Sequence, residues 1–163
     1  MGDLLDEIRG NKGIKIKILI LLFRLSGLSK FGGVFYFFYL FVPLYRFYSE
    51  IIIGLDLSYR TSIGFGLKIY HGYGIVVHPD CVIGRNCTIR QGVTLGNKIT
   101  HCGVASSAPV LGDHVELGAN CIVIGPVSIG DNVVIGAGAV VTKSISENTV
   151  VVGFGFRELE KAI

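Results

Sequence analysis

Aliphatic residues recur every six positions through most of this chain. Thirteen such positions carry only Leu, Ile or Val, with one eight-residue step before Ile83 and a longer interruption before Leu111. The positions are Leu57, Ile63, Ile69, Ile75, Ile83, Ile89, Leu95, Leu111, Leu117, Val123, Ile129, Ile135 and Val141. A helix repeats at 3.6 residues and a lone strand at 2, so this period predicts a parallel β-helix with three hexads in each triangular coil. Thirteen hexads predict roughly four coils.

The residues around each aliphatic position fit the same repeat. The residue two positions earlier is small or apolar, and glycine often follows the aliphatic residue. Asn86, Asn120 and Asn132 stand three positions after it, where a turn with positive φ favours Asn or Gly. We therefore expect the aliphatic residue and the one two positions before it to point into the core.

The four cysteines do not have the spacing of a metal site. Cys81, Cys87 and Cys121 occupy the inward small position of a hexad, so we expect them to pack in the core. Cys102 lies in the interruption, where we expect it to be exposed. The chain has no CxxC pair, so we predict no metal and reduced thiols, as is usual in the cytoplasm.

Charge and composition exclude other classes of protein. The chain is 50% hydrophobic and has 23 Gly, which is too apolar for a disordered protein. The first 50 residues hold seven Lys or Arg and four Asp or Glu, whereas residues 51–163 hold eight of each. No basic stripe with interleaved aromatics follows residue 50, so we predict no nucleic-acid partner.

The apolar N-terminal third has two interpretations. Its apolar runs are too short to span a membrane, and basic residues punctuate segment 14–53. One interpretation is a helical segment whose aromatic face packs on the rest of the protein or on a second subunit. The other is peripheral contact with the inner face of a membrane. The acidic start does not resemble a secretory signal, so we expect a cytoplasmic protein.

These patterns predict three parts. Residues 1–54 form a mostly helical, apolar N-terminal segment. Residues 55–146 form an all-β parallel β-helix, from which loop 97–108 projects because it is too long for a turn. Residues 147–163 form a C-terminal cap that includes a short helix at Arg157–Ile163.

Two segments carry a resemblance to a known family. They are Ile69-Tyr70-His71-Gly72-Tyr73-Gly74-Ile75-Val76-Val77 and Arg90-Gln91-Gly92-Val93-Thr94-Leu95-Gly96-Asn97. With the hexads, they resemble the hexapeptide-repeat acetyltransferases, the serine acetyltransferase-like branch, and within it the colanic acid and exopolysaccharide O-acetyltransferases. The resemblance implies a left-handed β-helix, a homotrimer with active sites between subunits, and acetyl-CoA lying along the coils.

The resemblance makes His71 the catalytic base. A neutral imidazole suits the removal of a proton from a hydroxyl near pH 7. Asp56, fifteen positions earlier, matches the carboxylate that orients the histidine in the serine acetyltransferase branch. The alternatives are an ordinary surface histidine and a solvated turn aspartate. His101, in the projecting loop, is a second acid/base candidate.

The same resemblance assigns residues to the donor. Small residues would let the pantetheine arm lie against the backbone, a backbone N–H near Gly92 or Gly118 would hold the oxyanion, and cations would meet the CoA phosphates. The implied residues are Gly92, Gly118, Ala119, Gly136, Ala137, Lys143 and Arg157. Arg157 ends the segment Gly153-Phe154-Gly155-Phe156-Arg157, which lacks the proline of the family pattern.

The acceptor is inferred from departures from the family pattern. Serine acetyltransferases have Asp before the catalytic histidine, where this chain has Tyr70, and an Arg-His pair where it has Ser107-Ala108. An amino acid acceptor needs such charged partners, so L-serine is disfavoured. Tyr70 and Tyr73 suit a carbohydrate acceptor.

We therefore predict an acetyl-CoA-dependent O-acetyltransferase acting on a sugar of a bacterial exopolysaccharide or capsule, or on its lipid-linked precursor. Asn97 and His101 of the loop join Tyr70 and Tyr73 as predicted acceptor residues. The alternatives are a serine O-acetyltransferase and a non-catalytic β-helix trimer. Retention of both His71 and Asp56 disfavours the second.

Overall fold

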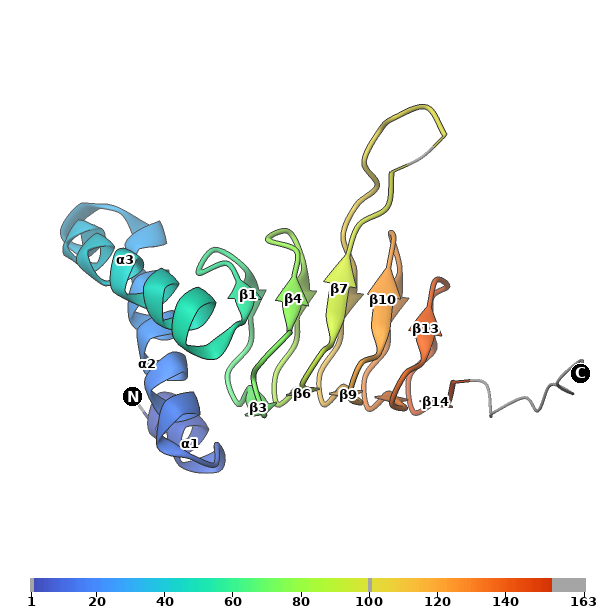
Figure 1. The fold of residues 1–163 in the computed structure, drawn as a ribbon, viewed down its shortest axis with the longest axis horizontal. Helices are drawn as coiled ribbons and strands as arrows, with labels where there is room; N and C mark the ends of the chain where they lie inside the picture. The colour runs from blue at the N-terminus through green and yellow to red at the C-terminus, as the bar shows by residue number, and fades with distance from the viewer. Residues whose placement is uncertain (1, 100, 154–163) are drawn as a thin grey trace, which may run out of the picture.

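The chain forms a stack of short parallel strands with a layer of helices across one end (Figure 1). The computed structural model describes residues 2–99 and 101–153. The helical segment consists of α1 (Gly2–Gly10), α2 (Ile14–Leu28), η1 (Ser29–Phe31), η2 (Gly33–Leu40), α3 (Phe41–Arg46) and η3 (Phe47–Ile53). The helical N-terminal segment expected from the sequence is thus present.

The strands form three flat faces around a common core. The first face is β1 (Asp56–Leu57), β4 (Val76–Val77), β7 (Thr94–Gly96), β10 (Ile122–Ile124) and β13 (Val140–Val141). The second is β2 (Ser62–Ile63), β5 (Val82–Ile83), β8 (Val110–Leu111) and β11 (Ser128–Ile129). The third is β3 (Lys68–Tyr70), β6 (Thr88–Arg90), β9 (Glu116–Leu117), β12 (Val134–Ile135) and β14 (Val150–Val151).

All these strand pairs are parallel, and each strand pairs with the one a full coil away, which fits the predicted left-handed β-helix. On the first face the ladder of inward residues is Leu57, Val77, Leu95, Val123 and Val141, all of them buried. The three turn asparagines have φ angles of 56° to 57°, as their position in the hexad predicts.

The eight-residue step lies earlier in the structure than the sequence predicted. Leu57 pairs with Val77, and the N–H of Asp56 donates to the carbonyl of Ile75. The two extra residues therefore lie between Ile69 and Val77, and not before Ile83 as the hexad count placed them. The sequence could not decide this, because Ile75 and Val77 are both aliphatic and both buried. The longer turn falls at His71.

The stack has five coils, where the hexads predicted roughly four. Ile145 bridges to Ile129, and Val151 of β14 pairs with Ile135 of β12, so the last coil is two residues shorter than 18. A six-residue step from Val141 therefore reaches Glu147 and not an aliphatic residue. The regular hexad count consequently missed this last coil. The β-helix continues through β14, past residue 146. The predicted helix at Arg157–Ile163 lies outside the described residues.

The segment between β7 and β8 projects from the stack, as Figure 1 shows. Its two arms meet through an antiparallel bridge between Ile99 and Ala105 and a hydrogen bond from the N–H of Ser106 to the carbonyl of Lys98 (2.7 Å). It leaves the β-helix at the edge between the first and second faces.

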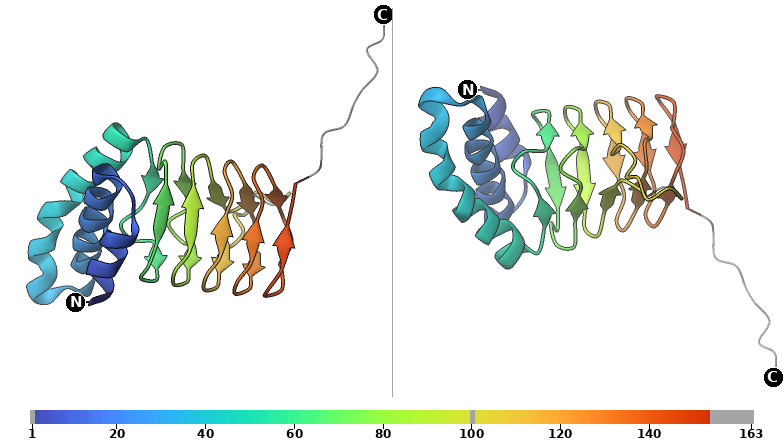
Figure 2. Two further views of the ribbon diagram at one scale, coloured as in Figure 1. Left: turned by 90° about the horizontal axis from the view of Figure 1, so that it is seen from below. Right: turned by 90° about the horizontal axis from the view of Figure 1, so that it is seen from above.

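The helices cover the open edge of the first coil (Figure 2). The buried carboxylate of Glu7 accepts a hydrogen bond from the N–H of Leu67 (2.8 Å). The side chain of Asn11 accepts from the N–H of Ile69 (2.9 Å) and donates to the carbonyl of Leu67 (2.7 Å). Two polar side chains from the end of α1 thus replace the strand that β3 lacks.

The other two faces are capped in the same way. The guanidinium of Arg24 donates to the carbonyls of Ile63 and Gly64 (both 2.7 Å) and forms an ion pair with Glu7 (2.6 Å). The hydroxyl of Tyr45 donates to the carbonyl of Leu57 (2.6 Å). The first strand of each face is thereby bonded to a helix side chain.

Removal of the Arg24 guanidinium tests this cap. Because it would leave the fully buried Glu7 carboxylate without its cation, we expect Arg24→Gln to lower the free energy of unfolding by about 3 kcal/mol. The exposed pair between Arg9 and Asp6 offers a matched control, and Arg9→Gln should cost no more than about 0.5 kcal/mol. Urea denaturation measures both, and equal losses would contradict the assigned role of Arg24.

Thiol labelling tests the core positions of the cysteines. Burial raises the pKa of Cys81 and Cys87 to about 11 and that of Cys121 to about 12, whereas Cys102 is exposed. A raised pKa keeps these three thiols protonated at pH 8, and burial shields them. Ellman's reagent at pH 8 should therefore modify one thiol in the native protein and four after denaturation. Rapid labelling of two or more native thiols would contradict this packing.

Candidate active site

The corner after β3 is the longest turn between the third and first faces. The carbonyl of His71 accepts a hydrogen bond from the N–H of Tyr73, and the N–H of Gly74 donates to the carbonyl of Gly54 (2.7 Å). His71 has a φ of 60°, and its side chain is exposed. His114 adopts the same conformation at an ordinary corner (φ 58°), so the backbone alone does not distinguish His71.

Helices α2 and η3 pack directly against this corner. A β-carbon on Gly72 would lie 3.0 Å from Cγ2 of Ile53 and 3.1 Å from Cδ1 of Ile16, so a larger residue here would push these side chains back by a few tenths of an ångström. Between these elements is a hollow of about 310 Å³ lined by His71 and Tyr73. The rings of His71 and Tyr73 are 6.4 Å apart. The predicted base, His71, therefore lies in a recess that is bounded on one side by helices α2 and η3.

Asp56 lies beside this corner, not in the same hollow. It begins β1, opposite Val76, and lines a neighbouring hollow of about 480 Å³ with Arg46 and Glu50. Within residues 2–99 and 101–153, no hydrogen bond joins Asp56 to His71. The hydrogen bond between Gly54 and Gly74 keeps the two segments adjacent, and the dyad stays a prediction.

The five small residues predicted to contact the donor lie on the same edge of the β-helix as His71. The corners after β3, β6, β9 and β12 stack on one another through backbone hydrogen bonds. The N–H of Gly92 donates to the carbonyl of Tyr73 (3.1 Å), Asn120 to Gln91 (2.9 Å) and Gly138 to Ala119 (2.9 Å). Gly92, Gly118-Ala119 and Gly136-Ala137 thus form one row of small residues that leads from His71 away from the helices.

Two of the backbone N–H groups on this edge are already engaged. Gly92 donates to Tyr73, and Gly118 donates to the carbonyl of Ile135 (2.7 Å). Among the described residues, the N–H of Gln91 faces the carbonyl of Tyr70 in the β3–β6 ladder, whereas the N–H of Ala119 has no acceptor. An oxyanion donor near Gly118 is therefore better supplied by Ala119.

The two predicted acceptor tyrosines have different surroundings. Tyr70 ends β3, and the Arg90 guanidinium lies over its ring at 5.0 Å. Tyr73 belongs to the turn, lines the His71 hollow and is 60% exposed. Tyr73 is thus open to a ligand beside His71, and Tyr70 carries a cation on its face.

Three other predicted residues lie on a different edge. Asn97 and His101 belong to the projecting segment between β7 and β8, and Lys143 follows β13 at the edge where that segment leaves the stack. Within one chain, the first face separates them from His71. Arg157 lies outside the described residues.

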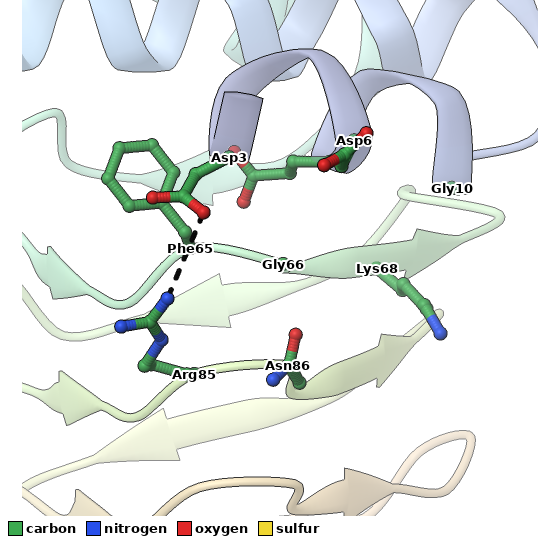
Figure 3. Close-up of a pocket in the computed structure, with 9 residues that line it drawn as sticks. Asp3, Asp6, Gly10, Phe65, Gly66, Lys68, Arg85 and Asn86 are labelled. Atoms are coloured by element: carbon green, nitrogen blue, oxygen red, sulfur yellow. Dashed lines mark ion pairs between the residues drawn. The ribbon is translucent and has the colours of Figure 1, made fainter. Parts of the chain in front are cut away.

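Figure 3 shows another hollow, of about 250 Å³, between α1 and the first two coils. Helix α1 contributes Asp3 and Asp6, and the coils contribute Lys68 and Arg85. Arg85 reaches Asp3 at 4.0 Å. No predicted site residue lines this hollow, and its charges link α1 to the coils. Across residues 2–99 and 101–153, no three His, Cys, Asp or Glu side chains are placed to hold a metal ion.

Five residues of the helical segment that line the His71 hollow were missed as site residues in the sequence. Lys12 and Lys15 flank the start of α2, Ile16 lies in its first turn, and Ile52 and Ile53 end η3. They belong to a segment without a repeat, and the contact joins residues far apart in the chain. The only hint was the interruption of an apolar run by Lys15.

Comparison with known proteins agrees with this architecture. Residues 108–143 match the family model "Bacterial transferase hexapeptide (six repeats)", and residues 75–100 match "Hexapeptide repeat of succinyl-transferase". A protein of Escherichia coli K12 named as the colanic acid biosynthesis acetyltransferase WcaB is 42% identical over 111 residues, which cover 68% of this chain and 66% of the relative. The chain belongs to the hexapeptide-repeat acetyltransferases.

Other members of the family are also similar. The serine acetyltransferase of Synechococcus elongatus is 35% identical over 70% of this chain and 46% of its own length. The crystal structure of Neisseria gonorrhoeae serine acetyltransferase in complex with serine has a TM-score of 0.69 and 31% identity, over 86% of this chain and 55% of that one. This member thus spans about half of those enzymes and 66% of WcaB.

Proposed function

We propose that this protein transfers an acetyl group from acetyl-CoA to a hydroxyl of a bacterial exopolysaccharide or capsule sugar, or of its lipid-linked precursor. The observation that carries the proposal is the position of the exposed His71 imidazole. It lies in a recess from which a row of glycine and alanine residues runs along the same edge of the β-helix. The similarity to WcaB, whose name assigns it to colanic acid biosynthesis, supports a sugar acceptor.

In this mechanism His71 acts as a general base. It removes the proton from the acceptor hydroxyl while the hydroxyl oxygen attacks the carbonyl carbon of the thioester. The oxyanion accepts a hydrogen bond from the backbone N–H of Ala119. The C–S bond then breaks, and the imidazolium returns its proton to the CoA thiolate. Asp56 acts as a positioning residue that holds the tautomer of His71 after a change of side-chain rotamer.

The surroundings of His71 disfavour the serine alternative. The ammonium group of L-serine needs a carboxylate partner. No Asp or Glu is among the residues that line the His71 hollow. Tyr73 offers an aromatic face and a phenol, which suit a sugar.

A homotrimer is part of the proposal. The first face carries exposed outward valines, Val76 and Val140, and the projecting segment carries exposed Ile99. These apolar groups suit burial against a second subunit. Such contact would bring Asn97, His101 and Lys143 of one subunit toward the His71 edge of its neighbour, with acetyl-CoA between them.

Peripheral membrane contact through residues 14–53 is a further part of the proposed function. None of the helices that the structure describes is both long and apolar enough to cross a bilayer. Helices η1, η2, α3 and the start of η3 expose large apolar side chains. They include Phe31, Tyr36, Phe37, Leu40, Leu44 and Phe47. Segment 14–53 holds five Lys or Arg and one acid, Glu50, which matches an anionic lipid surface. We place the enzyme in the cytoplasm at that surface.

Release of CoA thiol from acetyl-CoA tests the reaction and its base. With fragments of bacterial exopolysaccharides as acceptors, we expect His71→Ala to lower kcat/KM by about 1,000-fold. His114→Ala is a matched control, because His114 is another corner histidine with positive φ, and it should retain full activity. Asp56→Asn should lower kcat by about 10-fold or more at unchanged KM for acetyl-CoA.

The acceptor panel includes L-serine. Release with serine alone would support the serine acetyltransferase alternative, and activity that survives His71→Ala would contradict the mechanism. Absence of transfer to every acceptor would favour a non-catalytic trimer.

Sedimentation with vesicles tests the membrane surface. We expect binding to vesicles that contain phosphatidylglycerol, weakened by salt. The double variant Phe37→Ser/Leu40→Ser should lower the partition coefficient by about 10-fold or more, because two exposed apolar side chains lose their burial in lipid. Val150→Ser, at the other end of the stack, is the control. The proposed membrane contact would be contradicted if the wild-type protein failed to bind vesicles. It would also be contradicted if light scattering showed that the protein self-associates through this surface.

A further inference from the structure

The charges beside His71 are all of one sign. Lys12 and Lys15 line the same hollow as His71, and no carboxylate is among its lining residues. The carboxylates nearest in sequence to Ile52 and Ile53, those of Glu50 and Asp56, line the neighbouring hollow, where Glu50 pairs with Arg46 at 3.0 Å. The recess therefore presents two cations to whatever approaches the imidazole.

Helix stability does not explain these lysines. Lys15 lies in the first turn of α2, a helix that has no acid there and no side-chain cap. A cation at that end opposes the helix dipole and destabilises the helix. No ion pair involves Lys12 or Lys15 in the described part of the chain.

Packing fixes where the lysines stand. Asn11, next to Lys12, is hydrogen-bonded to Leu67 and Ile69 of the strand that leads to His71. The carbonyl of Lys15 accepts a hydrogen bond from the hydroxyl of Tyr48 (3.3 Å). The backbone on both sides of the lysines is thus anchored, while their side chains remain exposed.

The lysines and the donor row lie on opposite sides of His71. The corners with small residues, from Gly92 to Gly138, extend from His71 toward the last coil. Lys12 and Lys15 belong to the helices at the opposite end of the stack (Figure 1). A cation on the helical side is badly placed for the phosphates of a CoA that follows the small corners. In the proposed transfer, the helical side is therefore left for the acceptor.

We infer that Lys12 and Lys15 form an acceptor subsite for a phosphate group, so that the accepting sugar is a phosphate or diphosphate ester. This rests on the proposed acetyl transfer. Isoleucines line or flank the recess, and Ile14 and Ile51 are 70% and 69% exposed. This apolar surround favours a diphosphate carried on an isoprenoid chain over one carried on a nucleoside.

Binding of inorganic pyrophosphate tests the subsite without any turnover. Isothermal titration calorimetry would be run on the full chain with CoA present. We expect Lys12→Gln/Lys15→Gln to weaken binding at least 10-fold, and Lys17→Gln, on the same helix but outside the hollow, to change it less than 2-fold. Absent binding, or equal affinity in the double variant, would overturn the inference. Pyrophosphate binding that requires both lysines, in a protein that acetylates nothing, would leave the subsite standing and refute the proposed function.

Acceptor kinetics test the chemistry of the subsite. The same sugar would be offered as its methyl glycoside, 1-phosphate, uridine diphosphate and farnesyl diphosphate derivatives. The double variant should raise KM at least 10-fold for the phosphorylated forms and leave the methyl glycoside and acetyl-CoA unchanged. A preference for the farnesyl form over the uridine form identifies the lipid-linked source, and the reverse identifies the nucleotide. Equal losses for neutral and phosphorylated acceptors, or a raised KM for acetyl-CoA, would overturn the assignment.

Discussion

The unpaired edge of the first coil is the constraint on which the rest of the structure depends. Every later coil is hydrogen-bonded to the one before it, whereas β1, β2 and β3 have no preceding strand. An uncovered edge would leave backbone groups unsatisfied and open to pairing with another chain. Glu7, Asn11, Arg24 and Tyr45 supply the missing bonds, and burial of the Glu7–Arg24 pair makes the cap hard to displace.

The same cap determines what surrounds His71. Asn11 reaches β3 just before the corner, so the chain must start α2 next to that corner. Lys12 and Lys15 then stand beside the imidazole, and Gly72 lets Ile16 pack against the turn. A contact that satisfies backbone groups therefore also builds one wall of the candidate active site. If the proposed acceptor site is correct, the stability of the cap and the recognition of the acceptor depend on the same contacts.

The sequence predicted what the repeat controls and missed what it does not. Periodicity identified the strands, the inward cysteines and the turn asparagines, because each depends on local hexad geometry. It misplaced the two extra residues, since Ile75 and Val77 satisfy the pattern equally, and it missed the shortened last coil. The sequence did not identify Lys12 and Lys15 as site residues, because they reach the recess through the tertiary packing of a segment that has no repeat.

The proposed catalytic residues lie where the repeat is broken. A regular coil offers equivalent corners, and residues such as His114 show that a corner histidine alone creates no recess. The turn at His71 differs because two added residues and the packed helices together form a hollow beside it. The other break, the segment between β7 and β8, leaves from the opposite edge of the same face. In the proposed trimer, contact across that face brings the two irregular elements of neighbouring subunits together, so assembly would complete a site that neither chain holds alone.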